Sequence, residues 1–280
     1  MSEQEDFSKI GELIKSFIEH ARLELKERWE KWTIDLSQNE IHEVVGALLA
    51  RQVTLSRQMA ESPLILNVHI APLILRAMAD VYISLAWVLK DPLERSRNYV
   101  LYGLGQAKLQ LEHRKAQIGD REPTTEEKML IEASEAWINS QRFAFLTEVN
   151  VGSWSGIPTR QMAKESDCID FYNYVYNPFS ACTHSMWHHI ARYNLRQCAN
   201  PLHQYHQVPE DPKFPIDPYN LYLSAKYLEK TFSAFDKKFG IKVDAPSAFD
   251  HLSEVLDGLS DNEGDKIDRM DVNLYKTEDT

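Results

Sequence analysis

Apolar residues recur every three or four positions along most of the chain, which is the spacing of one face of an α-helix. Long stretches of Leu, Ala, Glu, Lys, Arg and Gln favour helix by propensity as well. Helices are predicted over about residues 7–32, 64–90, 92–118, 125–149, 159–164, 167–198 and 219–238, with a further one that begins near residue 40. We therefore expect an all-α fold, an elongated bundle of about seven or eight helices with no sheet.

Several local signals mark the expected helix ends. Residues 37–40 and 124–127 each match the capping box that opens a helix. Pro178 falls inside the helix predicted over 167–198 and would disturb its backbone hydrogen bonds. Residues 201–218 carry five prolines, which predicts an extended connector rather than a helix.

Acidic residues are unevenly placed, and this suggests how the chain is divided. The formal net charge is −11, and residues 257–280 hold eight acidic against three basic residues, or −5 of it. We expect a single helical domain over 1–257 and an acidic disordered tail over 258–280, which has little apolar surface to bury. Phosphate binding needs clustered Lys and Arg, so the acidic body disfavours duplex DNA as a partner and does not favour RNA, although RNA stays open.

One apolar stretch is long enough to span a bilayer, but it contains charges. Residues 63–89 include Arg76 and Asp80 near their middle, and each would cost about 2.5–3.5 kcal/mol at a membrane centre. We interpret the stretch as a buried core helix and expect no membrane partner. The first residues are acidic and lack the apolar core of a signal peptide, so a cytoplasmic location is predicted.

Sequence motifs for cofactors and metals are weak. Cys168, Cys182 and Cys198 are odd in number and no pair has the C-x-x-C spacing, so neither a disulfide framework nor a zinc knuckle is expected. Residues 152–156 resemble a nucleophile elbow, but Trp154 occupies the position of the serine. We predict no cofactor and no metal site.

Two polar groups interrupt apolar helix faces and are the candidates for chemistry. Arg76 and Asp80 are four residues apart, hence neighbours on one face. They are interpreted either as a structural ion pair or as the lining of a ligand pocket, because a buried arginine must be paired.

A second group repeats at every fourth residue of the helix predicted over 167–198. It could be a half-buried packing face, a site centred on His184 that faces Arg76 and Asp80, or a metal site that pairs His184 with His188, for which no third ligand is evident. The repeating residues are Tyr172, Tyr176, Ser180, His184 and His188.

These residues carry a family resemblance. Trp154-Ser155-Gly156, then Arg160-Gln161-Met162-Ala163, and then Tyr172, Tyr176, Ser180 and His184 follow a W-S-G-x-x-x-R-x-M-A … Y-x-x-x-S-x-x-x-H pattern. Over about residues 41–189 the chain resembles an uncharacterised bacterial helical family, a domain of unknown function. The resemblance implies helices, a bacterial cytoplasm and, in some members, a link to mobile elements or phage defence. It also places Trp154 and Arg160 beside the candidate pocket. Asp80 departs from the family's pattern, which has Glu there.

Three functions are therefore open, and whether the protein is an enzyme is not decided by the sequence. The first is a regulatory or interaction module with a buried polar pocket, which would bind a small molecule or a protein, or form a homodimer. The second is an endoribonuclease similar to the helical HEPN group, for which Arg196 and His203 have the expected spacing. The third is a hydrolase in which His184 acts as a general base beside Asp80 and Arg76.

Overall fold

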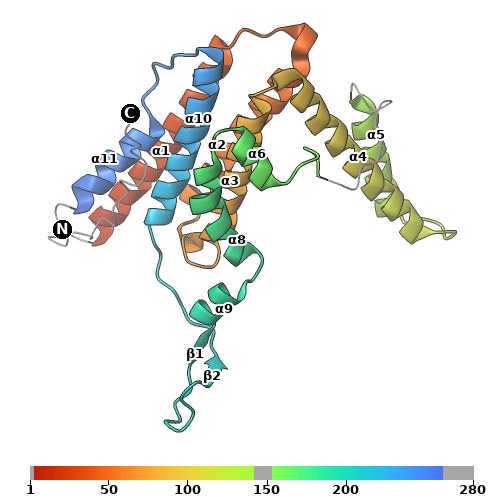
Figure 1. Cartoon of the computed structure of the whole chain (residues 1–280). Coiled ribbons are helices and arrows are strands. Elements are labelled where there is room, and N and C mark those ends of the chain that lie inside the picture. Colours follow the sequence, from red (N-terminus) through yellow and green to blue (C-terminus); the bar gives the residue numbers. More distant parts are fainter. Residues whose placement is uncertain (1–2, 142–152, 261–280) are drawn as a thin grey trace.

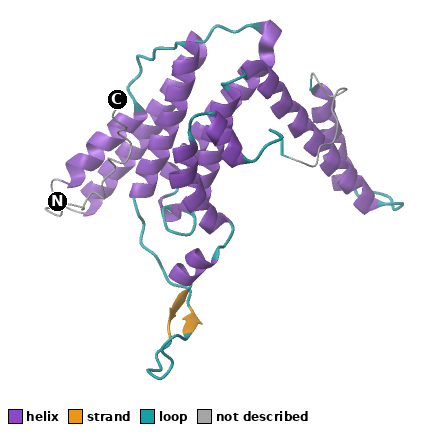
Figure 2. Ribbon diagram, in the orientation of Figure 1, coloured by secondary structure: helices purple, strands orange, loops and turns teal. Residues whose placement is uncertain are grey.

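The computed structural model describes residues 3–141 and 153–260, and these residues are mostly helical (Figures 1 and 2). The long helices are α1 (Glu3–Lys31), α2 (Asn39–Glu61), α3 (Ala71–Val88), α4 (Pro92–Ile118), α5 (Thr125–Ser140), α10 (Tyr219–Phe239) and α11 (Ala248–Ser260). The shorter ones are α6 (Thr159–Glu165), α7 (Ile169–Phe171), α8 (Asn177–Thr183) and α9 (Trp187–Tyr193). A π-helical turn, η4 (Tyr172–Tyr176), joins α7 to α8.

Helices α2, α3 and α10 pack against one another and form the centre of the body. Helix α3 is apolar on most sides, as expected of a helix that is covered on several sides, and Leu75, Met78 and Ile83 are fully buried. On one flank α1 and α11 complete the core, and on the other α6, α8 and η4 cover α3. At the centre, the fully buried Gln52 side chain of α2 donates to the Met78 and Tyr227 carbonyls, which ties α2 to both neighbours.

Among the described residues α3 is the one helix long and apolar enough to cross a membrane, and 56% of it is buried inside the body. Helices on several sides cover it, as in the core helix of a soluble protein. The interpretation of residues 63–89 as a core segment is consistent with this placement. The helix starts only at Ala71, because Pro72 fits the first helical turn, where no backbone N–H is needed.

Two parts project from the body (Figure 1). The C-terminal part of α4 and the whole of α5 form an antiparallel helical pair, which we call the arm and define as residues 107–140. At another end the chain after α9 forms a hairpin of strands β1 (Leu195–Gln197) and β2 (Gln207–Pro209), in which Arg196 lies opposite Val208. We call its connecting residues 198–206 the hairpin loop.

The predicted all-α class is confirmed in its broad form, and two details are wrong. A two-stranded antiparallel sheet exists where none was expected, and there are more helices than seven or eight. The extra helices arise mainly from residues 167–198, predicted as one helix, which divide into α7, η4, α8, α9 and β1. The predicted tail lies outside the described residues from 261 onward, and residues 248–260 are helical in α11.

A Schellman motif at the end of α8 explains the division of the predicted helix. Ser185 has a positive φ of 48°. Its N–H donates to the Cys182 carbonyl at 3.1 Å, and the Met186 N–H donates to the Ala181 carbonyl at 2.9 Å. This pair of bonds closes a helix when the residue after its last turn adopts the left-handed conformation. The position is usually glycine, so serine here gave no stop signal in the sequence.

Candidate functional site

The polar cluster predicted around Arg76 forms at the contact between α3 and α8. Arg76 is 8% exposed, its Nε donates to the Ser180 hydroxyl at 2.8 Å, and its Nη1 donates to the Asp80 carboxylate. The sequence left open whether Arg76 and Asp80 form a structural ion pair or line a ligand pocket, and in the structure they form an ion pair. The guanidinium also lies over the ring of Tyr176, where the face of the aromatic ring attracts a cation.

The π-helical turn η4 brings the tyrosines to this cluster. Its wider backbone carries Tyr172 and Tyr176 on one side, and their rings stack with centroids 4.7 Å apart and an interplanar angle of 21°. Pro178 then lies in the first turn of α8, and the Ser180 hydroxyl donates to the Tyr176 carbonyl at 2.9 Å. Single π-helical turns often lie at functional sites, and here the turn aligns the tyrosines and Ser180 with Arg76.

The two charges of the cluster differ in exposure. The Arg76 side chain is 10% exposed, whereas the Asp80 side chain is 49% exposed and faces solvent on one side. Partial burial raises the pKa of Asp80, and the Arg76 guanidinium and the Tyr176 hydroxyl oppose this shift. Burial also raises the pKa of Tyr176. Because Arg76 contacts Ser180, Asp80 and Tyr176 at once, the cluster can clamp α8 and η4 onto α3.

His184 does not join this cluster. It occupies the C-cap of α8, its backbone N–H donates to the Ser180 carbonyl, and its side chain is exposed. Among residues 3–141 and 153–260 no hydrogen bond or ion pair of its imidazole is found. The enclosed imidazole expected from the sequence is therefore not what the structure shows. His188 lies on the next helix, α9, and is exposed too, so the i,i+4 relation of the two histidines is lost.

Trp154 and Arg160 are not among the residues that contact Arg76. The Trp154 ring packs edge-on against Trp87, with centroids 5.2 Å apart, and against Tyr99 at 4.7 Å, which places it by the end of α3 and the start of α4. Arg160 is exposed on α6. The residues predicted to line one pocket thus divide into the cluster around Arg76, a half-buried Trp154 packed against Trp87 and Tyr99, and the exposed Arg160 and His184.

Arg196 and His203, the alternative ribonuclease pair, both lie in the hairpin. Arg196 is exposed on β1, and its Nε lies 3.7 Å from a Glu210 carboxylate oxygen. His203 is in the hairpin loop, where its Nδ1 lies 3.3 Å from Nδ1 of His206. The two residues of the motif therefore lie on a strand and in a loop, and Arg196 already contacts Glu210 while His203 contacts His206.

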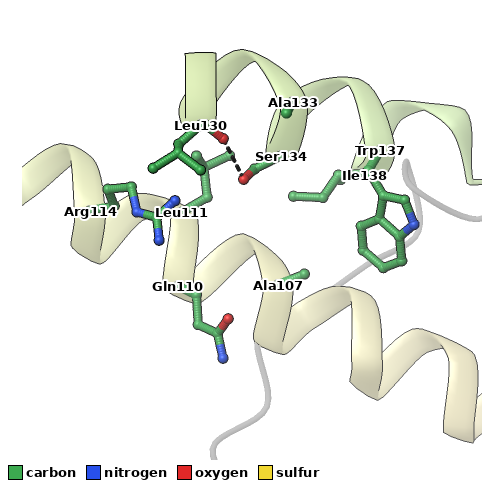
Figure 3. A pocket seen from close by; sticks show the side chains of 9 residues that line it. All are labelled: Ala107, Gln110, Leu111, Arg114, Leu130, Ala133, Ser134, Trp137 and Ile138. Atoms are coloured by element: carbon green, nitrogen blue, oxygen red, sulfur yellow. Dashed lines mark hydrogen bonds between the residues drawn. The ribbon is translucent and has the colours of Figure 1, made fainter. Parts of the chain in front are cut away.

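A cavity that the sequence interpretation missed lies in the arm (Figure 3). It has a volume of about 320 Å³ and opens between α4 and α5, with Trp137 at one end and Arg114 at the other. Leu111 and Ile138 are buried at its floor, whereas Leu130 and Trp137 are each 52% exposed. The lining residues are Ala107, Gln110, Leu111, Arg114, Leu130, Ala133, Ser134, Trp137 and Ile138. Their spacing of three and four on both helices was a readable signal in the sequence.

A comparison with protein families identifies a family for this chain. The model of a family described as "Family of unknown function (DUF5677)" matches residues 42–200. That range contains the Arg76 cluster, the whole arm and the first residues of the hairpin loop. Neither a curated protein nor a solved structure matches the chain.

Proposed function

Since the chain belongs to the DUF5677 family, whose function is unknown, we propose from its own geometry that it is an interaction module that pairs with a second copy of itself through the arm. The observation that carries this proposal is the poor burial of α5. Of its 16 residues only Ile138 is buried. An isolated helix of this length is marginal in water, so α5 gains stability mainly from the apolar surface it can cover.

The apolar residues that α5 leaves exposed lie where a partner could cover them. Met129 is 64% exposed, and Leu130 and Trp137 are 52% exposed. Leu130 and Trp137 border the 320 Å³ cavity, which has room for a side chain from a neighbouring helix. Fully burying one large apolar side chain contributes about 1.5–3 kcal/mol, so three half-exposed ones offer a useful part of a binding energy.

Charge favours a second copy of this chain as the occupant. The α4 half of the arm, residues 107–118, carries three basic residues and one acidic residue, a net charge of +2. Helix α5 carries four acidic residues and one basic residue, a net charge of −3. In a two-fold pair α4 of each copy would face α5 of the other, which forms a four-helix bundle with opposite charges across both contacts. Lys115 on α4 already pairs with Glu135 on α5 at 2.8 Å within one chain.

The polar cluster supports a structural role more than a catalytic one. Arg76 is buried and contacts Asp80, Ser180 and Tyr176, and Ser180 uses its own proton on a backbone carbonyl. His184 is exposed on α8, so a general base next to this cluster is not assembled. The hydrolase and ribonuclease alternatives therefore stay predictions with less support. The cytoplasmic location and the link to mobile elements or phage defence stay predictions from the sequence resemblance.

The oligomeric state of the full chain tests the proposal. We expect light scattering at about 50 µM, above a micromolar Kd, to give twice the chain mass of 32.4 kDa. The double variant Leu130→Glu/Trp137→Glu should run as a monomer with an unchanged circular dichroism spectrum. A matched control changes two other exposed apolar residues on the body, Leu36→Glu and Leu64→Glu, and should leave the dimer intact.

Charge reversal separates self-pairing from other apolar association. One variant carries Lys108→Glu/Arg114→Glu on α4, and the other carries Glu126→Lys/Glu132→Lys on α5. Each alone places like charges across both contacts and should be monomeric, whereas a mixture should form a heterodimer. A monomeric wild-type chain, or a dimer that survives the Leu130/Trp137 changes, would refute the proposal.

A further inference from the structure

Three side chains that commonly bind metals converge in the hairpin loop. Cys198 Sγ lies 3.6 Å from His203 Nδ1, and His203 Nδ1 lies 3.3 Å from His206 Nδ1. One ligand atom from each of the three residues lies within 4.8 Å of the others. The residues follow a C-x₄-H-x₂-H spacing. This spacing is neither a C-x-x-C pair nor an i,i+4 pair of histidines, so it matches neither of the metal-binding patterns considered in the sequence.

The distances match those between ligands of one tetrahedral zinc ion. With zinc–nitrogen bonds of about 2.0–2.1 Å and a zinc–sulfur bond of about 2.3 Å, tetrahedral angles put two nitrogens about 3.3–3.4 Å apart. The same geometry puts a sulfur and a nitrogen about 3.5–3.6 Å apart. The separations of 3.3 Å between the two imidazole nitrogens and 3.6 Å between Cys198 Sγ and His203 Nδ1 therefore agree with this geometry.

The hairpin loop is held in this shape by its own backbone. The Cys198 N–H donates to the His206 carbonyl at 3.0 Å, the His203 N–H donates to the Asn200 carbonyl, and the His206 N–H donates to the His203 carbonyl. Across the loop, the Gln197 side-chain amide donates to the Gln204 carbonyl at 2.8 Å. These bonds fix all three ligand positions on the same side of a short turn.

The same loop lacks an apolar core that could stabilise it. Leu202 is 87% exposed and Tyr205 is 95% exposed, and each strand of the hairpin is three residues long. A two-stranded hairpin of this size is marginally stable in water by itself. A bound ion adds its binding free energy to folding, which is how small domains without a core are often stabilised.

We propose that Cys198, His203 and His206 bind one zinc ion that closes the hairpin loop. A thiolate and two imidazoles suit a late first-row divalent ion, and zinc accepts them in a tetrahedral arrangement. The fourth position is left to water or to a group from a partner. His203 would bind through Nδ1, which requires Nε2 to carry the proton. The Asn200 side chain, whose Nδ2 lies 3.2 Å from that Nε2, would then have to turn its oxygen to His203 and give up the hydrogen bond that this oxygen accepts from the Leu202 N–H.

Such a site bears on the ribonuclease alternative. A histidine bound to zinc through one nitrogen and protonated on the other has no free nitrogen to accept a proton. His203 could not then act as a general base beside Arg196. The metal site and the Arg196–His203 catalytic pair are therefore mutually exclusive uses of the same side chain.

Cobalt substitution of the untagged full chain tests the site. Cobalt(II) added to metal-free protein should give visible bands of a tetrahedral ion and a thiolate-to-cobalt band at a stoichiometry of about one. The wild-type chain purified without chelator should also contain about one zinc per chain. In Cys198→Ser the thiolate band should disappear and the zinc content should fall at least about tenfold, because the ion loses its sulfur ligand.

Matched variants distinguish this site from adventitious binding. Cys182→Ser and His188→Ala remove a cysteine and an exposed histidine elsewhere and should keep both the band and the zinc. His203→Ala and His206→Ala should each weaken binding. Far-UV circular dichroism of all variants should stay helical, since the hairpin loop contributes no helix. Less than about 0.1 zinc per chain with no thiolate band in the wild type, or a band that persists in Cys198→Ser, would overturn the proposal.

Discussion

Replacing Arg28 with Met should strongly destabilise the body, and the structure gives the size of the effect. Arg28 of α1 is 3% exposed and donates from Nε and Nη2 to both carboxylate oxygens of Asp236 on α10, at 2.9 Å and 2.7 Å. Its Nη1 donates to Glu24, which is itself 3% exposed, and its guanidinium lies 4.0 Å above the Phe232 ring. Arg28 therefore pairs with both Glu24 and Asp236, one on its own helix and one on α10.

The cost follows from the charge that the variant leaves behind. Removing one partner of a buried ion pair destabilises a protein by about 3–5 kcal/mol, because the other charge stays buried without compensation. Glu24 would keep one hydrogen bond, from the Ala248 N–H at 2.9 Å. Met fills much of the space of the arginine stem, so little of the loss should come from packing.

The loss should depend on pH in a known direction. Burial already raises the pKa of Glu24 above its ordinary 4.5, and the Arg28 charge opposes that shift. Without Arg28 the pKa of Glu24 rises further, so folding is weakened more as the pH increases through that raised value. The difference between wild type and variant should therefore be larger at pH 7 than at pH 5, where Glu24 can take up a proton.

Urea unfolding at pH 7 and pH 5 measures both effects. The control is Arg57→Met, which breaks a pair of the same i,i+4 spacing with Glu61, whose side chains are 26% and 38% exposed. That change should cost no more than about 1 kcal/mol. If Arg28→Met costs no more than the control, or costs the same at both pH values, burial does not set the energy of this network.

Two further predictions concern other carboxylates. Hydrogen bonds from Lys31 and from the backbone of Asp244 and Ala245 lower the pKa of Glu27 to about 2. The Glu27 carboxylate therefore stabilises the fold above pH 4.5, its ordinary pKa, and this contribution is lost as the pH falls towards 2. In acid unfolding, Glu27→Gln should make the free energy of unfolding depend less on pH between 4.5 and 2. Asp80→Asn should cost about 1–3 kcal/mol in urea unfolding, more than Arg57→Met and less than Arg28→Met, because the half-exposed Asp80 leaves behind the buried Arg76 without its carboxylate; a loss no larger than that of the Arg57→Met control would show that Arg76 does not depend on this pair.

Helix ends were predictable where a side chain supplies the cap. The Thr124 hydroxyl accepts from the Glu127 N–H at 3.2 Å, and Glu127 accepts from the Thr124 N–H at 2.8 Å, which is the capping box the sequence indicated. Gly240 ends α10 with a φ of 67°, as a glycine stop should. The box expected at residues 37–40 does not form, because Asp35 caps a short 3-10 turn there and α2 begins at Asn39.

Contacts between residues on different secondary-structure elements could not be predicted from residue spacing. The Arg76–Asp80 pair depends on i,i+4 geometry alone, and it forms as expected. Cys198, His203 and His206 come together because strands β1 and β2 pair on either side of the nine-residue hairpin loop. The local sequence of the proline-rich connector does not predict these strands. The same limit applies to the arm, because apolar residues at helical spacing do not tell whether the chain itself covers them.

The length of α3 explains why the predicted helix over residues 167–198 breaks. At 1.5 Å per residue such a helix would be about 48 Å long, whereas the 18-residue α3 on which it packs spans about 27 Å. Beyond α8 a straight continuation would run past this surface. The chain turns instead at Ser185, and His189 packs near His69 with ring centroids 5.9 Å apart. That turn moves His184 to the surface while Ser180, one helical turn earlier, stays on Arg76. The four-residue spacing from Ser180 to His184 therefore predicts a position next to Arg76 only while the chain stays helical along α3, and the chain leaves that helix directly after His184.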